Sequence, residues 1–173
     1  MSRKGRVIVY TGDGKGKTTA AFGAAMRANG HGFRVAIVQF IKGPWDYGEV
    51  RAIEGCSNIE VTRIGSGFTG LANDPSEPRM LAREAWEVAR RTALTDLYDL
   101  LVLDELNCAV AEGYVSVDEV LGLLAEKPER LSLVITGRAA RSEIIAAADT
   151  ATEMRSLKHA YDDGVPARKG IEY

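Results

Sequence analysis

A glycine-rich run that follows a short apolar segment restricts this chain to few folds. Residues 7–10 form the apolar segment, and Thr11-Gly12-Asp13-Gly14-Lys15-Gly16-Lys17-Thr18-Thr19 comes directly after it. A strand, a glycine-rich turn and Gly-Lys-Thr at the start of an alanine-rich helix are typical of a phosphate-binding P-loop. Glycines let backbone N–H groups converge on phosphates, and the helix N-terminus adds its dipole. The pattern therefore predicts a nucleotide site formed by Gly12, Asp13, Gly14, Lys15, Gly16, Lys17, Thr18 and Thr19.

Two side chains of this run have distinct expected roles, although the spacing of the run is unusual. Lys17 is expected to reach phosphate oxygens, and the Thr18 hydroxyl to ligate Mg²⁺. The usual motif has four residues between its first glycine and Gly-Lys-Ser/Thr. Thr11 occupies the first glycine position here, and counted from Gly12 the loop is one residue short. We therefore expect a loop with its own geometry. A plain turn without a ligand is the alternative, which three glycines and two lysines in nine residues disfavour.

Length, charge and cysteine content narrow the class of protein further. A chain of 173 residues with 46% hydrophobic content predicts one P-loop domain over residues 1–173. A formal charge of −2 gives no general attraction to nucleic acid or anionic membranes, so neither is expected as a partner. No leader-like segment or run of about 20 apolar residues is seen, which predicts a cytoplasmic location. Of two cysteines, Cys108 is expected to be a small buried hydrophobe.

Apolar segments alternate with helical segments along the chain. Strands are expected at residues 7–10, 35–40, 59–64, 100–103 and 131–135, and helices at 17–29, 74–94, 117–126 and 142–148. Continuous apolar strands that alternate with helices predict a mostly parallel sheet with helices on both faces. Ligands of such sheets bind at the carboxyl ends of the strands, and polar clusters follow several of the expected strand ends.

Candidate residues for the second half of the site follow two later strands. Asp104 and Glu105 directly follow the strand at 100–103. We expect this strand beside the P-loop strand, and a carboxylate at its end can hold Mg²⁺. The spacing does not say which of the two acids touches the ion. Arg138 follows the strand at 131–135 and either meets phosphate or pairs with a carboxylate at the surface. Arg27, on the P-loop helix, likewise either contacts the nucleotide or is an exposed helix residue.

An aromatic residue in a glycine-rich loop has two possible roles. Phe68 lies in the loop at 65–73, between Gly67 and Gly70, where it belongs to no helical or strand stripe. It either anchors the loop on the core or offers an apolar surface to a flat ligand.

Further motifs follow the P-loop in order along nearly the whole chain. They are Val38-Gln39-Phe40-Ile41-Lys42-Gly43, Gly67-Phe68-Thr69, Val102-Leu103-Asp104-Glu105-Leu106, Ile135-Thr136-Gly137-Arg138 and the ending from Lys158-His159-Ala160-Tyr161 to Gly170-Ile171-Glu172-Tyr173. In these motifs the chain resembles the ATP:corrinoid adenosyltransferases of the CobA/BtuR/CobO type. The resemblance implies a RecA-like P-loop fold, a homodimer, and ATP bound with its phosphate order reversed along the loop. Reversed binding agrees with the unusual loop spacing.

The resemblance also implies a reaction. The cobalt(I) of a corrinoid, either cobalamin or a biosynthetic precursor, attacks the 5′ carbon of ATP and releases triphosphate, which yields an adenosylcobalamin-type cofactor. A reductase supplies cobalt(I). By the same resemblance, Thr18 and Glu105 are expected to hold Mg²⁺, or Mn²⁺, with Asp104 in support, and Lys17 and Glu105 are expected to be catalytic. The resemblance also implies that Phe68 packs on the corrinoid, and a tail at 158–173 is expected to close near the site. Gly70 stands where some relatives carry Trp, so the sequence does not identify which corrinoid is preferred.

Two other functions are compatible with the P-loop and the acidic strand end. A P-loop ATPase or small-molecule kinase would use Lys17, Thr18 and Asp104, with Glu105 orienting water, and would form ADP. A non-catalytic switch would bind ATP with negligible turnover. The products of ATP distinguish the three functions, because only adenosyl transfer releases intact triphosphate.

Overall fold

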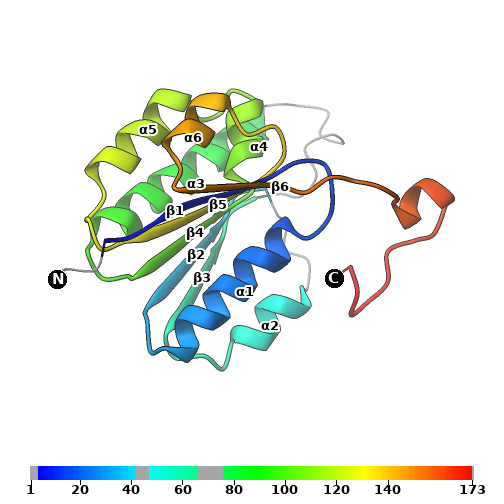
Figure 1. The fold of residues 1–173 in the computed structure, drawn as a ribbon, viewed down its shortest axis with the longest axis horizontal. Coiled ribbons are helices and arrows are strands. Elements are labelled where there is room, and N and C mark those ends of the chain that lie inside the picture. The colour runs from blue at the N-terminus through cyan, green and yellow to red at the C-terminus, as the bar shows by residue number, and fades with distance from the viewer. Residues whose placement is uncertain (1–3, 42–46, 66–75, 173) are drawn as a thin grey trace.

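The protein forms a six-stranded sheet in which every pair of neighbouring strands is parallel (Figure 1). The computed structural model describes residues 4–41, 47–65 and 76–172. The strands are β1 (Val7–Thr11), β2 (Val35–Gln39), β3 (Ile59–Arg63), β4 (Leu100–Asp104), β5 (Ser132–Thr136) and β6 (Thr150–Glu153). Their order across the sheet is β3-β2-β4-β5-β1-β6. The five expected strands are confirmed to within one residue at either end. β6 was not expected, because its four residues are all exposed and show no apolar run.

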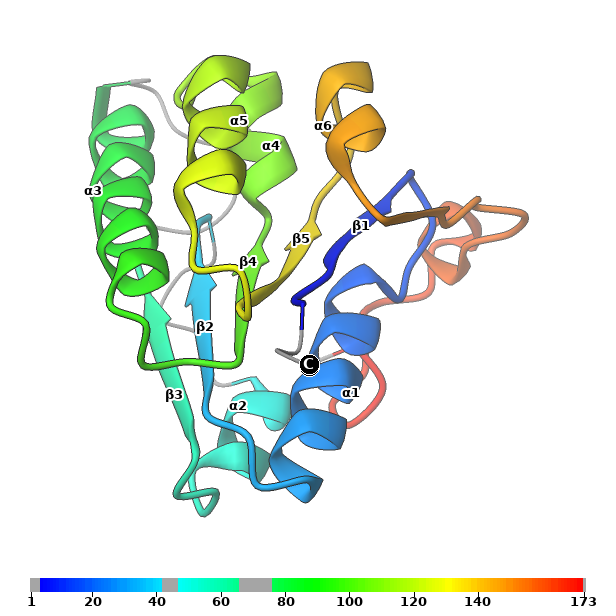
Figure 2. The same ribbon diagram turned by 60° about the vertical axis from the view of Figure 1, so that its left-hand side comes forward.

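Helices cover both faces of this sheet, as predicted. They are α1 (Lys17–Gly30), α2 (Gly48–Ile53), α3 (Ser76–Leu94), α4 (Leu106–Ala111), α5 (Val117–Glu126) and α6 (Ser142–Ala147), and a 3₁₀ turn, η2, covers Ala160–Asp163. Figures 1 and 2 show α1 and α2 on one face and α3 to α6 on the other. A capping box begins α5, since Ser116 and Glu119 exchange side-chain and backbone hydrogen bonds. α2 and α4, with six residues each, are too short to show helical periodicity in the sequence.

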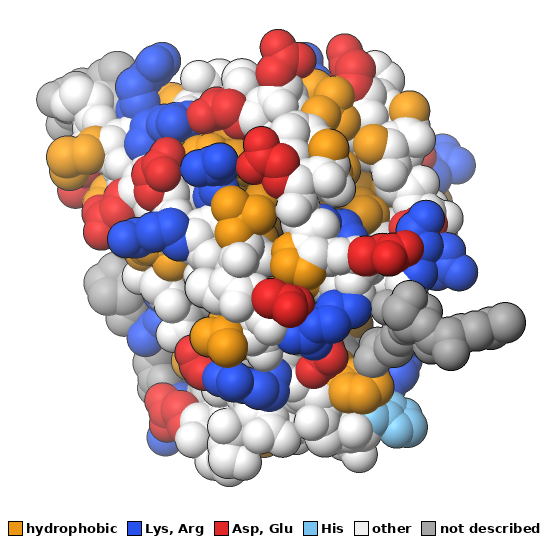
Figure 3. Space-filling model, turned by 90° about the vertical axis from the view of Figure 1, so that its left-hand side faces the viewer, with side chains coloured by type: hydrophobic (Ala, Val, Ile, Leu, Met, Phe, Trp, Pro, Cys, Tyr) orange, Lys and Arg blue, Asp and Glu red, His pale blue; other side chains and the backbone are white. Residues whose placement is uncertain are grey.

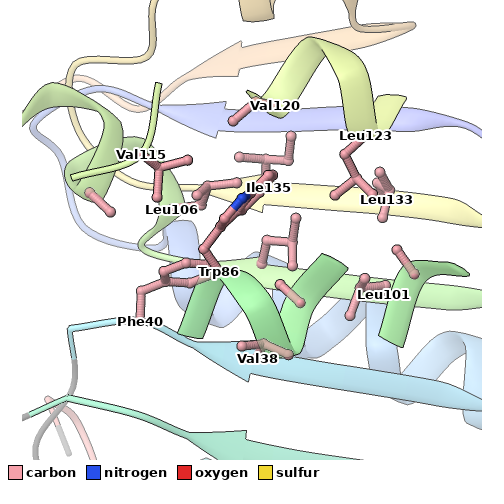
Figure 4. Packing of buried hydrophobic residues seen from close by; sticks show 14 of the residues in the cluster. Val38, Phe40, Trp86, Leu101, Leu106, Val115, Val120, Leu123, Leu133 and Ile135 are labelled. Atoms are coloured by element: carbon pink, nitrogen blue, oxygen red, sulfur yellow. The ribbon is translucent and has the colours of Figure 1, made fainter. Parts of the chain in front are cut away.

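Each face of the sheet has its own hydrophobic core. Along β2, Val38 and the following Phe40 pack in the cluster under α3, whereas Ile37 points into the cluster under α1. Successive strand residues point to opposite faces, and here both faces are covered, so every residue of β2 is buried. In Figure 4, Trp86 of α3 lies among Phe40, Leu106 and Ile135. The continuous apolar strands in the sequence reflect this double burial.

The order of the central strands differs from the expectation in one respect. β4 was expected beside the P-loop strand β1, but β5 lies between them (Figure 2). β5 pairs with β1 on one side and β4 on the other, with Thr136 beside Tyr10 and Ile135 beside Leu103. Sequence order does not set strand order, because a right-handed crossover can skip a neighbouring position. As a result, the end of β5 lies between the P-loop and the two acids.

Charges on the described surface are mixed in sign. In the face seen in Figure 3, basic and acidic side chains are interspersed with small apolar spots. Cross-element ion pairs are consistent with this mixture, such as Arg83 with Glu119 and Arg130 with Asp96. Within the described ranges, none of the helices combines the length and the apolar character that a membrane span requires.

Candidate functional site

The candidate site lies at the carboxyl ends of four neighbouring strands. The loop after β1 leads into α1, and Asp104, Thr136 and Gln39 are the last residues of β4, β5 and β2. Ligands of open parallel sheets bind at this edge. The fold thus brings the glycine-rich loop and the acidic strand end together, although they are far apart in the sequence.

The loop itself is shaped by left-handed glycines and by a buried lysine. Gly12 has φ 92° and Gly16 has φ 110°, a region that disfavours residues with a Cβ. Lys17 is only 8% exposed, and its Nζ donates to the carbonyl oxygens of Gly12 at 2.6 Å and Gly14 at 2.7 Å. Burial lowers the pKa of Lys17, and the negative charge of Glu105 partly offsets that shift. The ammonium group therefore lies at the centre of the loop.

The segment that ends β6 packs directly against the loop. Gly14 N–H donates to the Met154 carbonyl at 2.7 Å, and Met154 N–H donates to the Thr11 carbonyl at 2.8 Å. A Cβ on Gly12 would lie 2.4 Å from the Met154 carbonyl oxygen, and one on Gly14 would lie 2.8 Å from the Arg155 carbonyl group. The glycines therefore allow the backbone of a neighbouring segment to approach closely. The sequence analysis missed this contact, because nothing in the run at 150–155 indicates it.

Asp104 is a buried acceptor held from three elements. Its side chain is 0% exposed. Oδ1 accepts from the Thr18 hydroxyl at 3.0 Å and from the Thr136 hydroxyl at 2.7 Å, and Oδ2 accepts from Gln39 Nε2 at 2.8 Å. Thr18 begins α1, Thr136 ends β5 and Gln39 ends β2. Asp104 thereby links the P-loop helix to the two strands that flank β4.

Glu105 adopts an unusual backbone conformation beside it. Its φ of 67° and ψ of 17° are left-handed, which is uncommon for a residue with a side chain and is typical of functional positions. Its N–H donates to the Thr136 hydroxyl at 2.9 Å, and its Oε2 accepts from the Cys108 thiol at 2.9 Å. Unlike Asp104, Glu105 is partly exposed. The two adjacent acids therefore differ in accessibility.

Cys108 does not behave as the expected buried hydrophobe. Its thiol is half-buried, donates to Glu105 and accepts from the Arg138 backbone N–H at 3.3 Å. Burial, together with the charge and hydrogen bond of Glu105, raises its pKa to about 12. The thiol therefore stays protonated near neutral pH and can donate to Glu105. A cysteine three residues after an acid on a short helix gives no sequence signal for this role.

The oxygen donors at this edge fit a hard divalent cation. The Thr18 hydroxyl and the carboxylates of Asp104 and Glu105 are the ligand type that Mg²⁺ and Mn²⁺ prefer. Among the described residues no group of three or more His, Cys, Asp or Glu could hold a metal alone. Mg²⁺ typically takes one or two carboxylates and completes its shell with phosphate oxygens and water. The donor set therefore fits an ion bound together with a polyphosphate.

Other predicted residues lie at varying distances from the loop. Arg138 Nε is 3.9 Å from Asp13 Oδ1, and both residues are exposed. Lys15 is also exposed, and its Nζ is 3.8 Å from Glu172 Oε1. Thr19 is exposed on the first turn of α1. Arg27 lies in the last turn of α1, exposed and about 15 Å along the helix axis from Lys17. Hence the structure does not bring Arg27 to the loop. Phe68 and Gly70 lie outside the described residues.

Two site residues escaped the sequence analysis as individual candidates. Thr136 and Gln39 are fully buried polar residues that contact Asp104. Both directly end an apolar strand, and a polar residue in that position of a parallel sheet is the signal that could have identified them. Gln39 Oε1 and Asn107 Oδ1 are, within the described part of the chain, the buried side-chain oxygen or nitrogen atoms without a hydrogen-bond partner.

Fold and site together define a P-loop nucleotide-binding α/β protein. Comparison with known proteins narrows this class. The family described as ATP:corrinoid adenosyltransferase BtuR/CobO/CobP matches residues 3–173. The chain therefore belongs to the ATP:corrinoid adenosyltransferase family.

Individual relatives are similar over almost their full length. The chain is 44% identical to the corrinoid adenosyltransferase of Escherichia coli K12 over 173 residues, which are 100% of this chain and 88% of the relative. It is 42% identical to the corrinoid adenosyltransferase CobA of Salmonella typhimurium LT2, again over 100% of this chain and 88% of the relative.

A solved structure supports the fold alone. EssC ATPases 2 and 3 from Geobacillus thermodenitrificans match with a TM-score of 0.50 and 11% identity. The match covers 96% of this chain, which spans only 35% of that chain. The expectation of an α/β fold with a mostly parallel sheet covered by helices on both faces is confirmed.

Proposed function

We propose that this protein transfers the 5′-deoxyadenosyl group of ATP to the cobalt(I) of a corrinoid and releases triphosphate. The observation that carries the proposal is the hydrogen bond from Thr18 to Asp104, which joins the P-loop helix to the acidic strand end. In a chain that belongs to the corrinoid adenosyltransferase family, this junction is where ATP and its metal ion would be held. Hydrolysis, phosphoryl transfer and a switch without turnover are not favoured, because they leave the family membership unexplained.

The proposed reaction needs charge stabilisation rather than proton transfer. A cobalt–carbon bond forms as the bond between the 5′ carbon and the triphosphate oxygen breaks, and the bonding electron pair leaves with the triphosphate. The cobalt nucleophile carries no proton, so no general base is required. In this proposal, Lys17, whose Nζ is held by the Gly12 and Gly14 carbonyls, and backbone N–H groups of the loop lie beside the position where this charge develops. They would therefore stabilise the transition state more than the ground state.

We assign the metal-binding roles to Thr18, Glu105 and Asp104. Glu105 is the accessible acid of the pair, which supports it as the direct ligand together with the Thr18 hydroxyl. Asp104 is buried and accepts three hydrogen bonds, which supports an orienting role. Mg²⁺, or Mn²⁺ in its place, would neutralise part of the triphosphate charge when bound. Lys17 and Glu105 are accordingly the residues that we propose as catalytic.

The remaining nucleotide contacts are assigned from the loop outward. ATP would lie along residues 12–19, with Asp13 toward the nucleoside and Arg138 beside Asp13. The 3.9 Å distance between Arg138 Nε and Asp13 Oδ1 supports placing these two residues together. Arg27, at the far end of α1, stays a prediction for the ATP site, and Phe68 stays a prediction for the corrinoid site.

We further propose one domain over residues 1–173, whose tail at 158–173 closes near the site. The 3.8 Å approach of Glu172 to Lys15 supports this position for the tail. We also propose that the protein works in the cytoplasm as a homodimer and receives cobalt(I) from a reductase. Exposed apolar side chains of the tail region support the dimer, with Leu157 at 89%, Tyr161 at 77% and Ile171 at 73% exposure.

An anaerobic assay tests the proposed function. Purified protein is mixed with ATP, Mg²⁺ and chemically reduced cob(I)alamin, and the corrinoid spectrum and phosphate products are followed together. Loss of the cobalt(I) band with an equal amount of intact triphosphate is the expected result. ADP and phosphate with an unchanged corrinoid would contradict it, as would no reaction with either cobalamin or incomplete corrinoids.

A further inference from the structure

The hydroxyl group of Thr136 connects the two acids of the site. It donates its hydrogen to Asp104 Oδ1 at 2.7 Å and accepts the backbone N–H of Glu105 at 2.9 Å. A threonine hydroxyl has one donor and two acceptor positions, so a single group serves both residues at once. Thr136 is 0% exposed, which keeps water from replacing either bond.

The position of Thr136 follows from the strand order. Because β5 lies between β1 and β4, its last residue is the one that faces both the P-loop strand and the acidic strand end. Thr136 is in register with Tyr10 of β1, and the preceding Ile135 is in register with Leu103, the residue before Asp104. The strand order therefore places one hydroxyl within reach of both acids.

The hydrogen bonds form one connected path through the proposed metal site. Asp104 Oδ1 accepts from Thr136 and also from Thr18, while Thr136 holds the N–H of Glu105. The left-handed backbone of Glu105 is unfavourable for a residue with a side chain. Contacts of its N–H and carbonyl groups are therefore needed to hold Glu105 in this conformation. Loss of the Thr136 hydroxyl would release the Glu105 backbone and remove one of the hydrogen bonds that hold Asp104.

We propose that Thr136 is the positioning residue of the metal–ATP site, which sets the placement of Glu105 relative to Asp104 and Thr18. This inference rests on the proposed function in so far as it takes these three residues as the metal-binding group. Thr136 itself contacts neither metal nor ATP in this proposal. Groups that hold metal ligands in place typically change metal affinity or activity by about 10- to 100-fold when they are lost.

Binding measurements on three variants test the proposal. Thr136→Val removes the hydroxyl at nearly constant volume, Thr136→Ala removes it without a β-branch, and Thr136→Ser retains it. Ser132→Ala is the matched control, because it removes a hydroxyl from the opposite end of the same strand, where the group accepts from the Arg6 N–H. Affinity for Mn²⁺·ATP and for ATP without metal is measured by calorimetry, and thermal unfolding reports on folding.

The expected result is a selective loss of metal-dependent affinity. Thr136→Val and Thr136→Ala should weaken Mn²⁺·ATP binding by about 10- to 100-fold, while binding of ATP without metal changes by less than about threefold. Thr136→Ser should restore Mn²⁺·ATP binding to within about threefold, and Ser132→Ala should bind like the wild type.

Opposite results would overturn the proposal. A positioning role toward the metal is contradicted if either hydroxyl-free variant folds and binds Mn²⁺·ATP with wild-type affinity. It is also contradicted if ATP affinity falls equally with and without metal. If Thr136→Val does not fold, the comparison of Thr136→Ala with Thr136→Ser decides. These binding measurements do not involve a corrinoid, so failure of adenosyl transfer by the wild type would reject the proposed function and leave this result standing.

Discussion

Thr18, at the start of α1, donates its hydroxyl hydrogen to Oδ1 of Asp104 at the end of β4, across 3.0 Å. The two residues come from segments that are separated by a whole strand in the sheet, since β5 lies between β1 and β4. The helix that begins with the P-loop lysine therefore reaches across β5 to the acidic strand end. This contact gives the site its proposed metal position and is the starting point for the first prediction.

We predict that Asp104→Asn keeps the fold but loses metal-dependent affinity. The new amide NH₂ would face Gln39 Nε2, but a turn of the Gln39 amide would present Oε1, which has no partner among the described residues, as acceptor. The free energy of unfolding should change by less than about 1 kcal/mol, and Mn²⁺·ATP affinity should fall about 10- to 100-fold. Denaturant unfolding and calorimetry measure the two effects.

A double variant checks the role of Gln39 in that prediction. When Gln39→Leu is added to Asp104→Asn, the introduced amide NH₂ is buried without the Gln39 acceptor. The double variant should therefore be about 1–3 kcal/mol less stable than Asp104→Asn alone. Equal stability of the single and double variants would show that the Gln39 amide does not turn.

Lys17→Ala should lower the rate of triphosphate release at least about 100-fold, because it removes the charge next to the leaving group. Lys17→Arg should not restore activity. The ammonium group lies between the carbonyls of Gly12 and Gly14 at 2.6 and 2.7 Å and is buried, a place that a planar guanidinium does not fit. Arg90→Ala, which breaks an exposed pair with Glu126, is the control for loss of a positive charge. Full activity of Lys17→Arg would mean that the loop needs only the charge.

Glycine-to-alanine substitutions should change stability in opposite directions in the loop and in the helix that follows it. Gly12→Ala places a Cβ 2.4 Å from the Met154 carbonyl oxygen at φ 92°, so we expect a loss of at least about 2 kcal/mol in the free energy of unfolding. Gly23→Ala, on the exposed side of α1 with nothing within 4 Å, should gain about 0.5–1 kcal/mol. Thermal and denaturant unfolding compare the two. An unchanged stability of Gly12→Ala would show that β6 can move away from the loop.

The capping box of α5 should give a pH-dependent contribution to stability. Burial tends to raise the pKa of Glu119, but hydrogen bonds from the Ser116 N–H and hydroxyl and from Arg83 outweigh it, so its pKa lies below the ordinary 4.5. A carboxylate with a lowered folded-state pKa stabilises the protein above its unfolded-state pKa and loses that effect as the pH falls through the folded-state value. Glu119→Gln should therefore cost about 0.5 kcal/mol at pH 7. The difference should disappear in acid.

Unfolding of the wild type and Glu119→Gln at a series of pH values measures this contribution. Glu126→Gln, which changes a more exposed acid on the same helix, serves for comparison. A difference between wild type and Glu119→Gln that stays constant down to about pH 3, well below the unfolded-state pKa, would contradict the prediction.

The sequence by itself determined the local elements and the identity of the chemistry-bearing residues. Apolar strands were recognisable because both faces of the sheet are covered, so residues such as Val38 and Ile37 had to be apolar on either side. The P-loop and the acids at the end of β4 were recognisable because their roles depend on a few neighbours in the chain. Family motifs then indicated the reaction, and the family was confirmed.

Only the tertiary structure decided which of these groups meet. The position of β5 between β1 and β4, the packing of Met154 on the loop and the contacts of Thr136, Gln39 and Cys108 all depend on residues distant in the sequence. Strand order follows from how helices cover the two faces of the sheet, which no short window of sequence contains. The same long-range packing made Thr136 the junction between the P-loop and the acids.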